Sequence, residues 1–275
     1  MRIRTILENQ EYVFDTDSVQ DISIPLIFNG DQPNTYGVAH ASSKAYQTDN
    51  FIGDTRQGGG SNFEQLVMTP HCNGTHTECL GHITHKRFNI VEQLKDSLIP
   101  ATLISVVPER AVSSDDTYMP EKNKEDVFIS KNVLEKALSS ASEVFLKALV
   151  IRTLPNDDSK KVRNYLDHEP PFISLEAMNY IVEAGIEHLL IDMPSVDRLF
   201  DEGNLNAHHI FWNIEKGSHE SVSKREMHKT ITEMIYVSDE IKDGPYLLNL
   251  QIAPFKSDAS PSRPLLYPLT EIVDH

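Results

Sequence analysis

The segment from His71 to His82 carries more groups that can do chemistry than any other part of the chain. Its twelve residues include three of the twelve histidines, both cysteines and the carboxylate of Glu78. Thiolate, imidazole and carboxylate are the side chains that bind first-row transition metals such as zinc. Polar residues of a surface loop are the alternative interpretation, but so dense a group of potential ligands favours a metal centre that activates water.

The spacing within this segment limits how the ligands are arranged. Cys72 lies four residues before His76. Glu78 lies two residues after His76 and four before His82. Gly74 argues against a regular helix and predicts a tight turn. His76 and Glu78 then point to the same side, as alternate residues of an extended segment.

The same segment resembles the signature of the metal-dependent cyclase family, which includes bacterial kynurenine formamidases and isatin hydrolases. That signature is His-x-Gly-Thr-His-x-Asp-x-Pro-x-His, and residues 72–82 read Cys-Asn-Gly-Thr-His-Thr-Glu-Cys-Leu-Gly-His. The family's first histidine corresponds to Cys72, its aspartate to Glu78 and its proline to Leu80. Both ligand replacements keep a group that binds metal. A register shifted by one residue would put His71 in the place of Cys72, and the sequence leaves this open.

Later segments extend the resemblance in the family's order, so that it covers roughly residues 20 to 270. They are Leu190 to Asp197, Asn206 to Trp212, and Thr230 to Ile235. The resemblance implies a metal-ligand histidine in the second segment, for which the alignment favours His208 over the adjacent His209. It implies a glutamate near the site in the third, which is Glu233. His208 and Glu233 are farther apart in this sequence than the corresponding residues are in the family, which implies an insertion near residues 216–229.

The resemblance implies a metal-dependent hydrolase that cleaves the C–N amide bond of a small formamide, lactam or cyclic imide through metal-activated water. It implies Cys72, His76 and Glu78 as ligands of a first divalent ion. It implies His82, His208 and Glu233 as ligands at a second position, and it leaves open whether one ion or two bind. His82 and Glu233 are also the candidates for proton transfer, because histidine exchanges protons near neutral pH. A thiolate ligand favours Zn²⁺, with Mn²⁺ as the alternative. The family resemblance further implies a homo-oligomer.

A non-catalytic binding protein of the same fold, stabilised by its metal, is the alternative function. Structural zinc sites are saturated by four protein ligands, whereas catalytic sites leave a position for water. The number of ligands that surround one ion would therefore distinguish the two functions.

The composition bounds the class of protein. A chain of 275 residues with 41 acidic and 25 basic residues has a formal charge of −16, which disfavours nucleic acid and anionic membranes as partners. No apolar stretch approaches the roughly 18 residues that a membrane span needs. The N-terminus turns acidic before a signal-peptide core could form, so we expect a cytoplasmic protein. Its two cysteines are then free thiols or metal ligands.

The apolar patterns predict one mixed α/β domain over residues 1–275. Short β-branched runs predict strands at residues 101–107, 146–152, 188–193 and 246–252. Ser130 and Ser174 each precede a helical pattern, and Gly185 ends the second one. The succession of strand, helix and strand indicates a partly parallel sheet with flanking helices, and the resemblance implies the swivelling β/β/α type. We expect loops at residues 53–61, 155–163 and 216–230.

Overall fold

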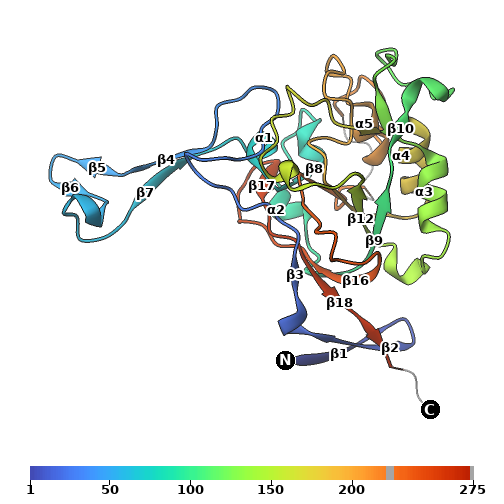
Figure 1. The fold of residues 1–275 in the computed structure, drawn as a ribbon, viewed down its shortest axis with the longest axis horizontal. Coiled ribbons are helices and arrows are strands. Elements are labelled where there is room, and N and C mark those ends of the chain that lie inside the picture. The colour runs from blue at the N-terminus through green and yellow to red at the C-terminus, as the bar shows by residue number, and fades with distance from the viewer. Residues whose placement is uncertain (221–225, 273–275) are drawn as a thin grey trace.

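A mixed sheet of nine strands forms the centre of the molecule (Figure 1). The computed structural model describes residues 1–220 and 226–272. In spatial order the strands are β17 (Ala259–Pro261), β8 (His76–Cys79), β15 (Thr230–Glu233), β14 (His188–Ile191), β12 (Ala148–Thr153), β9 (Leu98–Val106), β16 (Gly244–Asn249), β18 (Leu265–Pro268) and β3 (Gln20–Asp21). The four central strands, from β15 to β9, pair in parallel, and the outer strands pair antiparallel. The predicted α/β fold with a partly parallel sheet is confirmed.

The predicted strands are apolar at nearly every position because both faces of the sheet are buried. All four overlap observed strands, which are β9, β12, β14 and β16, with ends that differ by a few residues. Leu149 and Ile151 of β12 pack into the cluster that the helices cover. Ala148 and Val150 pack into a second cluster on the opposite face.

Helices cover one face of this sheet, and two of them begin at the predicted caps. α3 (Lys131–Leu138) follows Ser130, whose side-chain oxygen accepts from the backbone N–H of Val133. α4 (Leu175–Glu183) follows Ser174, which caps it in the same way, and the chain then turns at Gly185 with a φ of 79°. The other α-helices of the described chain are α1 (Pro70–Asn73), α2 (Ile90–Gln93) and α5 (Asn206–Phe211).

Smaller sheets and turns surround this core. The strands are β1 (Arg2–Leu7), β2 (Gln10–Asp15) and β19 (Thr270–Glu271) in one sheet, β10 (Glu109–Arg110), β11 (Val127–Ile129) and β13 (Phe172–Ile173) in another, and the pairs β4 (Ser42–Ala45) with β7 (Glu64–Val67) and β5 (Gln47–Thr48) with β6 (Phe51–Ile52). Short 3-10 helices span Thr16–Ser18, Thr55–Gln57, Leu80–His82, Ala111–Ser113, Glu143–Phe145 and Asp158–Val162.

Residues 42–67, which we call the arm, form a two-stranded ribbon that projects away from the body of the molecule (Figure 1). The predicted loop 53–61 lies within this arm. The predicted loop 155–163 contains a 3-10 helix, and residues 221–225 of the predicted loop 216–230 lie outside the described residues. Within the described chain, every helix is too short or too polar to cross a membrane.

A buried ion pair joins two parallel strands at their carboxyl ends. The Lys160 ammonium lies 2.7 Å from the carboxylate of Asp192, which directly follows β14. It also donates to the carbonyl oxygen of Thr153, the last residue of β12. Both charged side chains are at most 4% exposed. Each therefore depends on the other for compensation of its charge.

We predict that Lys160→Met lowers the free energy of unfolding by about 3–5 kcal/mol, because it leaves the Asp192 carboxylate buried without a counter-charge. Urea unfolding followed by circular dichroism measures the change. The matched control is Lys256→Met at an exposed pair with Glu92, which should cost less than about 1 kcal/mol. Equal losses in the two variants would contradict this prediction.

Candidate metal centre

Two antiparallel strands bring the first ligand candidates face to face. β8 and β15 pair so that His76 lies directly opposite Glu233 and Glu78 opposite Ile231. His76 and Glu78 point to one side of β8, as alternation in a strand requires. On its other side the hydroxyl of Thr77 contacts that of Thr232 at 2.8 Å. The sheet thus fixes the backbone of both candidate ligands.

The ring of His76 presents a buried lone pair to a carboxylate. Its Nδ1 lies 2.9 Å from the carbonyl oxygen of Gly74, which only accepts, so Nδ1 carries the proton and Nε2 is an acceptor. This Nε2 lies 3.4 Å from Oε2 of Glu233. Among the residues that the structure describes, His76 Nε2 has no hydrogen-bond donor, although it is buried. Two acceptors that face each other in a buried site favour a cation between them.

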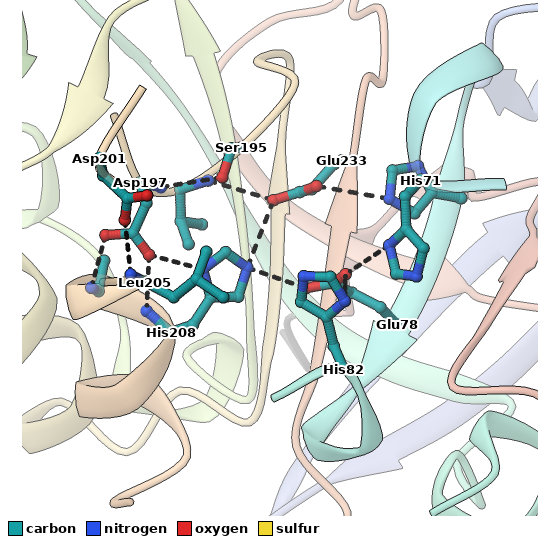
Figure 2. A network of polar contacts seen from close by, with 12 residues as sticks. His71, Glu78, His82, Ser195, Asp197, Asp201, Leu205, His208 and Glu233 are labelled. Carbon is teal, nitrogen blue, oxygen red and sulfur yellow. Dashed lines mark hydrogen bonds and ion pairs between the residues drawn. The ribbon is translucent and has the colours of Figure 1, made fainter. Parts of the chain in front are cut away.

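Glu78 is the centre of the histidine cluster (Figure 2). Its Oε1 lies 3.0 Å from Nε2 of His208, and its Oε2 lies 3.0 Å from Nδ1 of His71. His82 Nδ1 lies 3.9 Å from the same Oε2. Burial raises the pKa of Glu78, but the positive charges and hydrogen bonds of these histidines hold it well below its usual value. The carboxylate is therefore ionised and available to a cation.

Asp197 orients His208 from behind. Its carboxylate lies 2.6 Å from Nδ1 of His208 and accepts the backbone N–H groups of Ala207 and His208 at the start of α5. The hydroxyl of Tyr118 donates to its other oxygen. Burial lowers the pKa of His208, but the hydrogen bonds to Asp197 and Glu78 raise it well above its usual value. With Nδ1 held by Asp197, Nε2 of His208 points at Glu78 and Glu233 (Figure 2). A carboxylate orients a histidine ligand in the same way in many metal sites.

A second layer of side chains lies between this cluster and solvent. The side chains of His71, His82 and Asp258 are 24%, 27% and 23% exposed, whereas those of His76 and Glu78 are at most 1% exposed. His71 Nε2 lies 2.8 Å from Asp258 Oδ2, and His82 Nδ1 lies 3.6 Å from it. Burial lowers the pKa of His71, but its hydrogen bonds to Asp258 and Glu78 raise it to about 10. The layer forms an open rim over a buried set of ligands.

The structure brings together five of the six predicted metal ligands, which are His76, Glu78, His82, His208 and Glu233. Cys72 is buried on α1 and is absent from the groups of candidate ligands among the described residues, whereas its neighbour His71 belongs to two of them. Burial and the charge of Glu233 raise the pKa of the Cys72 thiol to about 11. His209, the alternative to His208, contacts the carbonyl oxygen of Ile214 instead.

Comparison with known proteins identifies the family. Residues 20–198 match the family model described as "Putative cyclase". The chain belongs to this family. Kynurenine formamidases of Bacillus cytotoxicus and Bacillus thuringiensis are 25% and 26% identical to this cyclase over 256 residues, which is 90% of the chain and 97% of each relative. The chain is thus a metal-dependent hydrolase of the cyclase family.

Solved structures share the fold of this cyclase. One is described as a predicted metal-dependent hydrolase from Bacillus stearothermophilus, with a TM-score of 0.58, 16% identity, and coverage of 90% of this chain and 97% of that one. Another is an isatin hydrolase bound to the product analogue thioisatinate, with a TM-score of 0.56, 13% identity, and coverage of 92% and 94%. Their similarity supports the arrangement of strands that carries the site.

Sequence reasoning missed Asp258. This residue stands immediately before β17, and β17 pairs with β8 so that Ala259 lies opposite Glu78. Only that pairing brings Asp258 to the rim, and no local pattern in the sequence signals it. Asp197 did stand out, as the end of a segment that resembles the family, but its contact with His208 requires the fold.

A separate group of potential ligands in this cyclase already pairs with a lysine. Asp96, Glu187 and His188 lie together at the amino ends of the central strands. The ammonium of Lys147 lies 3.0 Å from Asp96 and 3.5 Å from Glu187, and it supplies the positive charge there. We therefore assign the metal to the histidine-rich cluster.

We predict that Asp197→Asn lowers the free energy of unfolding of this cyclase by about 2–3 kcal/mol, because one amide oxygen cannot replace both carboxylate oxygens toward four buried donors. Tyr118→Phe removes one donor only and should cost about 1 kcal/mol. Chemical denaturation of both variants measures the difference. A loss in Asp197→Asn no larger than that in Tyr118→Phe would show that the carboxylate does not hold α5 in place.

Proposed function

We propose that this enzyme hydrolyses the C–N amide bond of a small formamide, lactam or cyclic imide at the cluster around Glu78. The kynurenine formamidase relatives support an amide substrate, since they align over nearly the whole chain. The rim of partly exposed histidines supports access for a small molecule.

The residues present fit a divalent metal ion. The single observation that carries the proposal is the buried Nε2 of His76, which has no hydrogen-bond donor among the described residues and lies 3.4 Å from the carboxylate oxygen Oε2 of Glu233. Together with Glu78 and His208 they offer the nitrogen and oxygen donors that such ions take. When bound, the ion would polarise the substrate carbonyl and lower the pKa of water from about 15.7 toward about 7.

We assign His71 to the ligand set in place of Cys72. The short helix α1 begins at Pro70 and turns His71, rather than Cys72, toward Glu78 and the rings of His76 and His82. This ligand set holds nitrogen and oxygen donors and no thiolate, so the preference of a thiolate ligand for zinc does not apply to it. Zn²⁺ remains our proposed metal because such sites bind it more tightly than Mn²⁺.

His82 is our candidate for proton transfer, and Glu233 for metal binding. The carboxylates of Asp258 and Glu78 both face His82 Nδ1, which supports a proton on that nitrogen. Nε2 is then free to take a proton from the attacking water and to deliver it to the leaving nitrogen. The backbone N–H of Val196 donates to Oε1 of Glu233 at 3.1 Å and supports a fixed carboxylate there. Asp258 would act as a positioning residue for His82.

The cytoplasm remains our proposed location. Cys72 and Cys79 are both free, as thiols are in a reducing compartment.

We predict that His71→Asn weakens binding of Zn²⁺ by at least about tenfold, whereas Cys72→Ser leaves it within about threefold. The reason is that His71 faces Glu78, while Cys72 lies outside the cluster. Competition with a chromophoric chelator measures both affinities. A loss confined to Cys72→Ser would reverse the assignment of the ligand.

We predict that the Zn²⁺-loaded enzyme turns over at least one formamide, lactam or cyclic imide in a substrate screen, and that His82→Asn lowers kcat by about 10²–10⁴-fold. Metal content and the unfolding midpoint should stay at the wild-type level, because His82 is partly exposed and is not among the proposed ligands His71, His76, Glu78, His208 and Glu233. A chelator should abolish turnover, and added Zn²⁺ should restore it. Turnover that is unchanged in His82→Asn would remove this residue from proton transfer. If no substrate in the screen turned over with the ion bound, the amidohydrolase proposal would fail.

A further inference from the structure

A cavity of about 770 Å³ lies against the helices α4 and α5, which pack against each other (Figure 1). Cavities of this volume hold small molecules rather than single ions. Each helix lines the cavity with residues three or four positions apart, which share one helical face. These residues are Leu175, Asn179 and Val182 of α4, and Asn206, His209 and Ile210 of α5.

This cavity, which we call the helix cavity, is distinct from the metal centre. Among the described residues that line it, none belongs to the proposed ligand set or to the rim. His208 and His209 are neighbours on α5, and consecutive residues of a helix project about 100° apart. His208 points at Glu78, whereas His209 lines the cavity. One helix thus has a face toward the ion and another toward the helix cavity.

A buried acceptor without a donor marks the wall of the helix cavity. Asn206 is 4% exposed, and its Nδ2 donates to the carbonyl oxygen of Met119 at 2.7 Å. This bond fixes which end of the amide is the oxygen. Among the residues that the structure describes, Oδ1 of Asn206 has no hydrogen-bond partner, although it is buried. Such an acceptor costs free energy that a donor on a ligand would recover.

Two further acceptors line the same cavity. Nδ1 of His209 lies 3.2 Å from the carbonyl oxygen of Ile214, which only accepts, so Nδ1 carries the proton and Nε2 is an acceptor. The carboxylate of Glu226 is 12% exposed and lies 2.5 Å from the ammonium of Lys229. The least exposed polar side chains of the cavity therefore offer acceptors to a ligand.

The chemistry of the wall defines the class of ligand. The rest of the cavity includes apolar side chains, which are Leu175, Val182, Ile210 and Ile214. A ligand that fits has hydrogen-bond donors at one end and an apolar body. A primary ammonium group has three donors and no acceptor. The net charge of −16 attracts cations and repels carboxylates and phosphates.

We propose that the helix cavity binds a small primary ammonium compound with an apolar body, and that its occupancy strengthens binding of the metal ion through α5. Asn206 and His209 would be the acceptors that hold the ammonium group. The apolar body would lie against the side chains of α4 and α5. The ammonium site does not depend on the proposed hydrolysis, whereas its effect on the ion rests on the proposed role of His208 as a ligand.

The contacts of α5 supply the coupling. Met119, which accepts from Asn206, directly follows Tyr118, whose hydroxyl donates to Asp197. Asp197 in turn orients the ring of His208. A ligand that holds Asn206 therefore restrains the same helix and the same segment that hold His208. Since part of the cost of ordering α5 is then already met, the ion binds more tightly, and by reciprocity the ion strengthens binding of the ammonium compound.

Isothermal titration calorimetry of the Zn²⁺-loaded enzyme tests the choice of ligand, with benzylamine as the probe. We expect a Kd of about 1 mM or tighter, as suits so small a ligand. Benzyltrimethylammonium has the same charge but no N–H donor, and it should bind at least about tenfold more weakly. Equal affinities for the two probes would overturn the role of the acceptors, and no binding of benzylamine would overturn the site.

Two variants of α4 test the location. Asn179→Trp places a large ring in the helix cavity from an exposed position, and it should weaken binding of benzylamine at least about tenfold. The matched control Glu183→Trp adds the same ring at an exposed residue of α4 outside the cavity and should leave the Kd within about twofold. His209→Phe, which removes one acceptor, should also weaken binding. Circular dichroism verifies that each variant is folded. Binding that Asn179→Trp and His209→Phe leave unchanged would place the probe elsewhere and overturn the proposal.

Competition with a chromophoric chelator tests the coupling. Saturating benzylamine should raise the affinity of the wild type and of Glu183→Trp for Zn²⁺ by about threefold or more, and it should leave that of Asn179→Trp unchanged. The same titration without protein corrects for benzylamine that binds free Zn²⁺. An unchanged affinity in the wild type would overturn the coupling. These readouts need no turnover, so their failure is distinguishable from failure of the amidohydrolase proposal.

Discussion

The site depends on one constraint, which is that it buries several carboxylates and holds too few protons to compensate their negative charge. Glu78, Glu233 and Asp197 are buried within a few ångströms of the rings of His76 and His208. Ionised carboxylates are costly to bury unless positive charge compensates them. The raised pKa values of His71 and His208 are one response, because these rings hold protons between carboxylates. The proton on His76 is directed to Gly74 instead, so that its other nitrogen is left to a cation.

The sheet determines where this charge accumulates. β8 lies between β15 and β17, and the two pairings bring Glu233 and Asp258 to either side of the His76–Glu78 strand. Strand backbones hold ligands more precisely than loops do. His208 comes from α5, whose first N–H groups are fixed by the same carboxylate that orients the ring. One acidic side chain, Asp197, thus positions both a helix and a ligand.

The sequence predicts the part of the site that is local in the chain, and the rest needs the fold. The dense segment from His71 to His82 indicates a metal centre by itself, and alternation places His76 and Glu78 on one side. The choice between His71 and Cys72 depends on one helical turn after Pro70, which a reading of spacings alone cannot orient. Asp258 reaches the rim only through strand pairing with β8.

The central strands and the caps at Ser130 and Ser174 were predictable because burial on both faces and capping leave local patterns. The arm leaves none, because its apolar residues have no buried face within the chain.

The arm and the metal centre are continuous along the backbone. β7 ends at Val67, α1 begins at Pro70, and the backbone N–H of Thr69 between them donates to the side chain of Asn73. His71 therefore stands one residue inside a turn that the arm leads into directly. Any restraint on the arm reduces the freedom of the His71 ring, and an ion that holds this ring restrains the base of the arm in return. Such coupling is reciprocal, so that the order of the arm and the affinity for the ion would rise and fall together, and chelation would loosen the base of the arm.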